Sequence, residues 1–322
     1  MKKYLLFVLV WMPLIAFSQV RYQDELFEKV NRTTEVYMQK NGQDYALDIY
    51  QPEGDTVKNR PMIIMVHGGG FSGGVRDEPR YINFLETFAR LGYVGVSISY
   101  ELRAKDIKGG VGCEMSRHEK VEIFKHTVHD LRKATAYLLD KSSEVGFDAS
   151  QIILAGSSAG AECILHAAYW PSDYMNIGEQ ILPDDFRYAG AVSLAGAILS
   201  LDWITKENAI PTMLFHGTCD NLVPYADAPH HYCEIDKPGY MVLHGGYSIA
   251  MKLQSVGESY FLYTDCGGHH GLCCEPLSEN IPDMIDYLYE TVIQKRTIQQ
   301  HIIVKNKIED RCAAYGTYDF CE

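Results

Sequence analysis

Short apolar runs alternate along the chain with longer segments in which apolar residues recur at helical spacing. Residues 62–66 form a continuous apolar run of strand length that ends at a row of glycines. Residues 81–91 place apolar side chains three or four positions apart, and Gly92 stops that pattern. The pattern predicts strands at 45–50, 62–66, 93–100, 151–155, 189–194, 212–216 and 259–263, and helices at 81–91, 118–139, 159–169, 248–256 and 281–294.

This alternation of strand and helix predicts an α/β fold. It is typical of a mostly parallel central sheet with helices on both faces. We expect one domain over residues 19–296 and a C-terminal tail over residues 297–322, in which Cys312 and Cys321 are expected to close a small disulfide loop. Residues 225–246 are irregular and polar, so they are a candidate for a local cap.

The first eighteen residues have the pattern of a cleaved secretory signal. Two lysines are followed by an apolar run and by small residues before Gln19. The alternative, a membrane anchor, is disfavoured because the run is short and contains Pro13. The sequence therefore predicts a secreted or periplasmic protein with no membrane anchor after cleavage.

Composition limits the partners of the chain. The 322 residues carry a net charge of -13, and 47 % of them are hydrophobic, which is usual for a globular protein. An acidic chain is poorly suited to phosphate backbones or anionic membranes, so no nucleic-acid partner is expected. The nine cysteines are an odd number, so in an oxidising compartment most should pair and at least one should not.

A G-x-S-x-G motif joins the expected strand at 151–155 to the expected helix at 159–169. Its central serine is Ser158, and Gly156 and Gly160 flank it at two residues on either side. A serine on such a sharp turn needs neighbours almost without side chains, which these glycines provide. Ser157 lies outside this register. On its own the motif is also common in ordinary strand-to-helix turns, so its context decides the interpretation.

Three other strand ends supply complementary chemistry. His67-Gly68-Gly69-Gly70-Phe71 follows the strand at 62–66, and the backbone N–H groups of Gly69 and Gly70, with that of Ala159, can converge on an oxyanion. His67 is expected to organise this loop and not to carry a proton. Asp220 follows the strand at 212–216, and the pair His269 and His270 follows the strand at 259–263.

The glycine-rich loop and the three motifs that carry the serine, the aspartate and the histidine, in that chain order, resemble those of the α/β-hydrolase fold serine esterases of the HGGG type. This group includes secreted acetyl xylan and feruloyl esterases. The resemblance covers residues 45–294. It implies Ser158 as nucleophile, Asp220 as the acid that orients the base, and one of the two histidines as general base. His269 is favoured over His270, because Gly268 precedes it, although Gly271 follows His270 equally well. The segment 99–103 departs from the family pattern beneath the oxyanion loop.

If Asp220 contacts the base, the loop that carries Cys219 lies beside the loop that carries Cys266, Cys273 and Cys274. We therefore expect a disulfide from Cys219 to one of these three, with Cys163 as a free buried thiol. The same cysteines with His269 and His270 could instead be read as a zinc set, which the need for oxidised cysteines and for a catalytic histidine disfavours. No metal and no cofactor are expected.

The leading functional expectation is a secreted serine carboxylesterase that hydrolyses acyl esters through an acyl-enzyme. The expected substrates are small-molecule or polysaccharide esters, with carbohydrate esters favoured. The alternatives are a serine peptidase, an amidase or a lipase of the same fold, and a binding module without catalysis.

Overall fold

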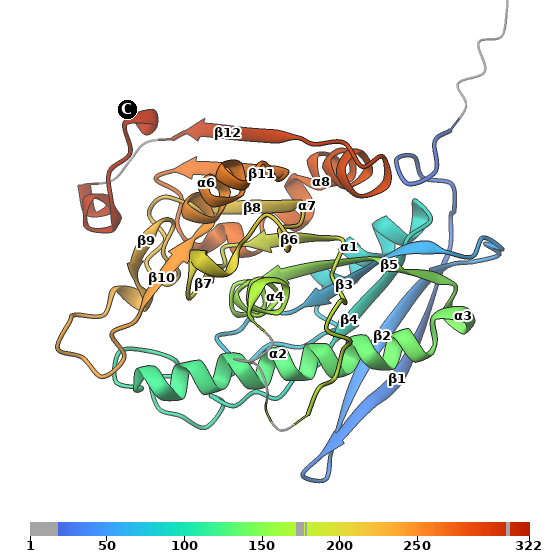
Figure 1. The fold of residues 1–322 in the computed structure, drawn as a ribbon, viewed down its shortest axis with the longest axis horizontal. Helices are drawn as coiled ribbons and strands as arrows, with labels where there is room; N and C mark the ends of the chain where they lie inside the picture. Colours follow the sequence, from blue (N-terminus) through green and yellow to red (C-terminus); the bar gives the residue numbers. More distant parts are fainter. Residues whose placement is uncertain (1–18, 172–176, 178, 307–309) are drawn as a thin grey trace, which may run out of the picture.

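A nine-stranded sheet forms the centre of the protein in a computed structural model that describes residues 19–171, 177, 179–306 and 310–322 (Figure 1). Its strand order is β1-β2-β4-β3-β5-β6-β8-β11-β12. The pairs β1–β2 and β2–β4 are antiparallel and all other pairs are parallel. Residues 1–18, for which the sequence predicts a signal peptide, lie outside the described residues.

The elements of the domain have the following bounds. The strands of the main sheet are β1 (Val30–Lys40), β2 (Gln43–Pro52), β3 (Arg60–Val66), β4 (Val94–Ile98), β5 (Phe147–Ser157), β6 (Gly190–Leu194), β8 (Thr212–Gly217), β11 (Tyr260–Cys266) and β12 (Gln299–Lys305). The helices are α1 (Pro79–Arg90), α2 (Arg117–Asp140), α3 (Ser142–Val145), α4 (Ala159–Tyr169), α6 (Gly246–Val256), α7 (Pro276–Glu279) and α8 (Ile281–Leu288), which a π-helical turn extends over Tyr289–Ile293.

Two hydrophobic layers cover the two faces of the sheet, because successive side chains of a strand point to opposite faces. Met62 and Ile64 of β3 pack in the layer that contains the inner residues of α2, α4 and α6. Ile63 and Met65 pack in the layer of α1 and α8. Strands buried on both faces read as continuous apolar runs, which explains the pattern at residues 62–66. The expectation of a mostly parallel sheet with helices on both faces is confirmed.

The two edge strands were not predicted. β1 lies at one edge and β12 at the other, where it runs parallel to β11 (Figure 1). The strand at 259–263, the last of those predicted, is therefore not the last strand of the structure. Edge strands carry fewer buried positions, and in β12 all seven side chains are exposed or only partly buried, so the apolar signal that identifies central strands is weak here.

The C-terminal tail is held by two long-range disulfides. Cys312 bonds to Cys219 after β8, and Cys321 bonds to Cys266 at the end of β11. The expected small loop between Cys312 and Cys321 is wrong, and so is the expected bond from Cys219 to Cys266, Cys273 or Cys274. The physical reason is the course of β12, which returns the tail to the edge of the sheet beside the ends of β8 and β11. Cys163 is free and buried, as expected.

A second, three-stranded sheet stands beside the carboxyl ends of the main strands. It consists of β7 (Ala197–Ile198), β10 (Val242–Gly245) and β9 (Asp227–Pro229), in that order. A 3-10 turn, η2 (His230–Tyr232), follows β9. Within the segment 225–246, β9 and β10 thus pair as an antiparallel ribbon, and η2 and the loop that follows it connect them.

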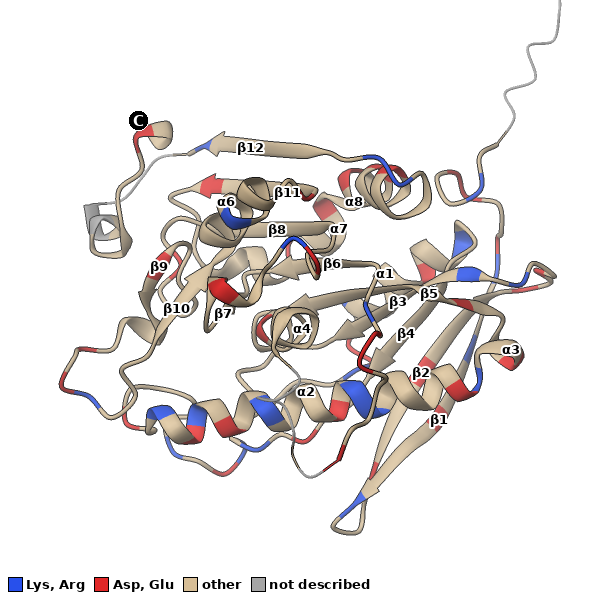
Figure 2. Ribbon diagram, in the orientation of Figure 1, with Lys and Arg blue, Asp and Glu red and all other residues tan. Residues whose placement is uncertain are grey.

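The charged residues lie mainly on helices and loops, and α2 presents both signs along its length (Figure 2). The inner strands β4, β6 and β8 contain no Asp, Glu, Lys or Arg. In the part of the chain that the structure describes, no helix is long and apolar enough to cross a membrane.

Replacement of both cysteines in the double variant Cys219→Ser/Cys312→Ser should lower the free energy of unfolding by about 2–4 kcal/mol, because the unfolded chain gains the freedom that the long loop had lost. Urea denaturation without reductant measures this change. Peptide mapping of the wild type that joined Cys312 to Cys321 would contradict the pairing.

Candidate active site

Ser158 occupies a strained turn between β5 and α4. Its backbone has φ 51° and ψ -119°, a conformation that a non-glycine residue rarely adopts. A Cβ atom on Gly156 would lie 2.4 Å from the carbonyl oxygen of Gly160, and one on Gly160 would lie 2.1 Å from that of Val66. The crowding expected from the sequence is present, and it allows no side chain at either glycine.

Ser158, His270 and Asp220 form a continuous hydrogen-bonded chain. Ser158 Oγ lies 2.8 Å from His270 Nε2, and His270 Nδ1 lies 2.7 Å from Asp220 Oδ2. An ionised carboxylate only accepts hydrogen bonds, so Nδ1–H of the imidazole donates to Asp220. Nε2 of the neutral ring then carries the lone pair that accepts the hydroxyl proton of Ser158. In this geometry a serine, a histidine and a carboxylate can act as nucleophile, base and orienting acid.

His269, which the sequence favoured as the base, is not part of this hydrogen-bonded chain. Its Nδ1 atom lies 3.0 Å from the carbonyl oxygen of Cys219. A glycine is needed at position 268 for another reason, because a Cβ atom there would lie 2.4 Å from Oδ2 of Asp265. His270 begins the 3-10 turn η3 (His270–Cys273), and its ring extends from there to Ser158.

The carboxylate of Asp220 is buried and has several donors. Leu222 N–H and Val223 N–H donate to Oδ1 at 2.9 and 3.0 Å, and Nε2 of His216 lies 3.3 Å from Oδ2. Burial alone would raise the pKa of Asp220, but hydrogen bonds from His216 and His270 hold this pKa well below its ordinary value. Asp220 therefore stays ionised and can stabilise an imidazolium at His270.

The loop that carries Asp220, called the acid loop, and the loop that carries His270, called the base loop, are joined by backbone hydrogen bonds. Cys219 N–H donates to the carbonyl of Gly268 at 2.8 Å, and Thr218 N–H donates to that of Asp265 at 3.0 Å. Gly267 N–H donates to Thr218 Oγ1 at 2.9 Å. The expected proximity of the two loops is correct, although no disulfide connects them directly; each is bonded to the C-terminal tail instead.

The glycine-rich loop after β3 packs directly against the serine turn. A Cβ on Gly68 would lie 2.9 Å from the carbonyl oxygen of Ser157, and the N–H of Gly68 donates to Tyr81 Oη at 3.1 Å. Gly69 has φ 117° and Gly70 has φ 60°, both in the region that favours glycine. The structure thus places Gly69 and Gly70 in the wall of the cavity that also contains Ser158 and Ala159.

His67, at the start of this loop, is held in place by contacts with Tyr100. Its ring stacks on Tyr100, with centroids 4.4 Å apart, and the hydroxyl of Tyr100 donates to the carbonyl of His67 at 3.0 Å. Burial lowers the pKa of His67, so the ring is neutral at ordinary pH. His67 organises the loop, as expected, and Tyr100 of the unusual segment 99–103 supplies its support.

A cavity of about 590 Å³ opens at the serine. Its walls come from the glycine loop, the loop before α2, the start of α4, the acid loop, η2 and η3. Its lining includes Arg80, Ser157, Glu162, His230, His231, Cys273 and Cys274. Because His230 and His231 belong to the ribbon 225–246, that segment forms one wall of the cavity.

Glu162 and His230 are two polar lining residues that the sequence analysis missed. Both are almost fully buried, and Glu162 Oε1 lies 3.3 Å from His230 Nε2. Burial raises the pKa of Glu162 to about 8 and lowers the pKa of His230 well below its ordinary value. The pair is therefore uncharged near pH 7. The sequence did contain a signal, because Glu162 is the only Asp, Glu, Lys or Arg in α4.

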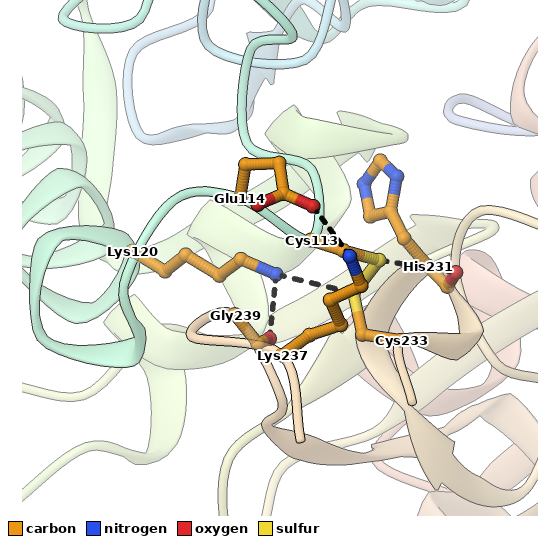
Figure 3. The surroundings of a disulfide bond; sticks show 7 residues. All are labelled: Cys113, Glu114, Lys120, His231, Cys233, Lys237 and Gly239. Carbon is orange, nitrogen blue, oxygen red and sulfur yellow. Dashed lines mark hydrogen bonds and ion pairs between the residues drawn. A yellow bond between two sulfur atoms is a disulfide. The ribbon is translucent and has the colours of Figure 1, made fainter. Parts of the chain in front are cut away.

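The disulfide between Cys113 and Cys233 ties two walls of the cavity together. It joins the loop before α2 to the chain that follows η2, at an S–S distance of 2.11 Å (Figure 3). Lys120 Nζ lies beside it and donates to the carbonyl of Gly239 at 2.9 Å. Burial lowers the pKa of Lys120 to about 8.

The zinc interpretation of the cysteine and histidine cluster does not fit the structure, because Cys266 is bonded to Cys321 and cannot act as a thiolate ligand. Within the described ranges, no group of three or more His, Cys, Asp or Glu side chains is arranged to hold a metal ion.

Comparison with known proteins gives a partial family match and a clear fold match. The BD-FAE family model matches residues 47–110. Phenmedipham hydrolase of Pseudarthrobacter oxydans is 32% identical over 127 residues, which are 39% of this chain and 23% of that protein. The probable carboxylic ester hydrolase LipM of Mycobacterium tuberculosis is 25% identical over 210 residues, 62% of this chain and 44% of that protein. The chain thus spans less than half the length of these two relatives.

Solved structures agree over most of the chain. The thermophilic esterase Est2 of the Planctomycetes species Thermogutta terrifontis superposes with a TM-score of 0.58 at 19% identity, covering 80% of this chain and 91% of Est2. The same esterase phosphoramylated by tabun has a TM-score of 0.58 and covers 83% of this chain and 96% of that one. Together with the sheet order, this similarity identifies the fold of the chain as the α/β-hydrolase fold.

The variant Glu162→Gln should change how stability depends on pH. The pKa of Glu162 is raised from 4.5 to about 8, so the folded protein retains a proton that the unfolded chain releases. Its contribution to stability is fully present below about pH 4.5 and is lost as the pH rises toward about 8. Relative to the variant, the wild type should lose up to about 1.4 kcal/mol of unfolding free energy per pH unit over this window.

Chemical denaturation of both proteins at several pH values between about 5 and 8 measures this difference. Glu144→Gln is the matched control, because the side chain of Glu144 is 71% exposed. Parallel stability curves for wild type and Glu162→Gln would contradict the assignment of a buried proton to Glu162.

Proposed function

We propose that the protein is a serine carboxylesterase that works through an acyl-enzyme. The single observation that carries this proposal is the hydrogen-bonded chain from Ser158 through His270 to Asp220 at the edge of a cavity. In this proposal Ser158 is the nucleophile, His270 is the general base and Asp220 orients and stabilises the protonated base.

In the first half of the reaction, Ser158 Oγ attacks the carbonyl carbon of the ester while its proton passes to His270 Nε2. A tetrahedral intermediate with a negative oxygen forms. Its collapse breaks the bond between the acyl carbon and the alcohol oxygen, and the alcohol leaves with the proton from His270. Asp220 remains ionised throughout, because its carboxylate is held by two backbone N–H groups and two imidazoles.

The oxyanion is assigned to the backbone N–H groups of Gly69, Gly70 and Ala159. The glycine loop touches the serine turn, and Ala159 is the first residue of α4, where backbone N–H groups point out of the helix. The N–H of Gly68 is already bonded to Tyr81, so it is not assigned to this role.

In the second half, water takes the position of the alcohol. His270 accepts a proton from the water, whose oxygen bonds to the acyl carbon. The carboxylic acid leaves, and Ser158 recovers its proton from His270. The reaction consumes one ester and one water and needs no cofactor.

A cavity of about 590 Å³ suits an ester of modest size. Glu162 and His230 add a polar, uncharged pair to the cavity wall, and this favours an ester that bears hydroxyl groups, such as an acylated carbohydrate. The partial match to BD-FAE and the two hydrolase relatives support ester hydrolysis. Peptidase, amidase and long-chain lipase activities are the competing outcomes.

The triad is tested with short-chain acyl esters of p-nitrophenol and with acetylated and feruloylated sugars. Ser158→Ala and His270→Ala should each lower kcat by at least about a thousand-fold, because each removes a member of a unit that acts together. His269→Ala is the matched control and should lose less than about ten-fold. Undiminished hydrolysis in Ser158→Ala, or equal losses in the two histidine variants, would refute these roles.

We also infer that the protein is exported and that residues 1–18 are removed. Three long-range disulfides support an oxidising compartment. Expression of the full chain in a secreting host should give a product that begins at Gln19, as measured by mass spectrometry of its N-terminal peptide. A product that retains Lys2 and Lys3 would contradict the export signal.

A further inference from the structure

Two neighbouring cysteines form part of the cavity wall next to the proposed base. Cys273 is the last residue of η3, the turn that His270 begins, and Cys274 follows it. Their Sγ atoms lie 2.8 Å apart, and both side chains are partly exposed where they line the cavity. The proposed ester hydrolysis uses neither sulfur atom.

This pair differs from every other cysteine of the chain. Six cysteines are bonded in three disulfides, and the seventh, Cys163, is free but buried. Cys273 and Cys274 are therefore the two free thiols that a small molecule entering the cavity can reach.

The surroundings favour a thiolate at Cys274. The hydrogen bond from Cys273 lowers the pKa of Cys274 and raises that of Cys273, and contacts with Ser157 and Arg80 lower the pKa of Cys274 further. Ser157 Oγ lies 3.7 Å from Cys274 Sγ. A thiolate, and not a thiol, is the nucleophile in exchange with a disulfide.

We propose that Cys273 and Cys274 are a redox-active pair that forms a reversible vicinal disulfide by exchange with small disulfides that enter the cavity. The thiolate of Cys274 attacks one sulfur of the small disulfide, a mixed disulfide forms and one small thiolate leaves. Cys273 then loses its proton and attacks Cys274 Sγ, and the second small thiolate leaves. The two cysteines lose two electrons and two protons, and the small disulfide becomes two thiols.

Neighbouring residues make this bond easier to reduce than the other three. Adjacent Cα atoms are about 3.8 Å apart, whereas disulfides usually span about 4.4–6.8 Å between Cα atoms, and departures from that range make the bond more reducible. The three long-range disulfides have Cα separations of 5.3, 5.0 and 5.6 Å. A mild reductant should therefore open the vicinal bond and leave the others closed.

The first test measures mass and does not depend on any enzymatic activity. Folded protein is treated with low dithiothreitol, freed of it, and then exposed to oxidised glutathione. Intact-mass analysis should show a loss of about 2 Da, which corresponds to two hydrogens, and peptide mapping should place it at Cys273 and Cys274. The variant Cys163→Ala should behave like the wild type, and Cys273→Ser should instead retain one glutathione on Cys274.

A stable glutathione adduct on the wild type, or no change in its mass, would overturn the proposal. So would a vicinal bond that opens only together with the three long-range disulfides.

The second test uses phenylarsine oxide, whose trivalent arsenic bonds to two thiols with loss of one water. The reduced protein should bind one phenylarsenic group, and the oxidised protein and Cys274→Ser should bind none. Because the phenyl group would fill the cavity, hydrolysis of p-nitrophenyl acetate by the reduced protein should fall more than about ten-fold. This activity readout rests on the proposed function, but the mass readout does not.

If the protein hydrolyses no ester, the bound phenylarsenic still decides the thiol proposal. Equal binding to the reduced protein and to Cys274→Ser would overturn it.

Discussion

The buried charge of Asp220 is the constraint on which the arrangement of the site depends. A carboxylate in a protein interior is costly unless donors surround it. Four donors from three segments meet this need: two backbone N–H groups of its own loop, His216 of β8 and His270 of η3. The requirement to satisfy one carboxylate thus fixes the relative positions of β8, the acid loop and the base loop.

The serine turn adds a second constraint from the other side of the cavity. It exists because β5 enters α4 with no Cβ atoms at Gly156 and Gly160, and because the glycine loop of β3 approaches it closely. His270 bridges the two constraints, since one ring nitrogen satisfies Asp220 and the other faces Ser158. Both hydrogen bonds form between residues of this chain, so Ser158, His270 and Asp220 are already in hydrogen-bonding positions in the structure.

Local features of the sequence were sufficient for the central strands, the longer helices α1, α2, α4, α6 and α8, the serine turn and the glycine-rich loop after β3. Each depends on neighbours in the chain, such as the continuous apolar run of β3 or the glycines around Ser158. For the base the sequence favoured His269, whereas in the structure it is His270 that lies between Asp220 and Ser158. Both histidines have an adjacent glycine, so the local pattern did not separate them. The disulfide partners were wrong because they depend on the path of the tail, and β12 carries too few buried residues to reveal that path.

The course of the tail has a consequence for the order in which the protein matures. Cys219 and Cys266 border the acid and base loops, but their partners are Cys312 and Cys321. Both partners lie downstream of the two loops in the sequence, so neither disulfide can form before its tail cysteine has been synthesised. The backbone hydrogen bonds between the two loops involve no residue of the tail, so the contact between the loops and its covalent reinforcement depend on different parts of the chain.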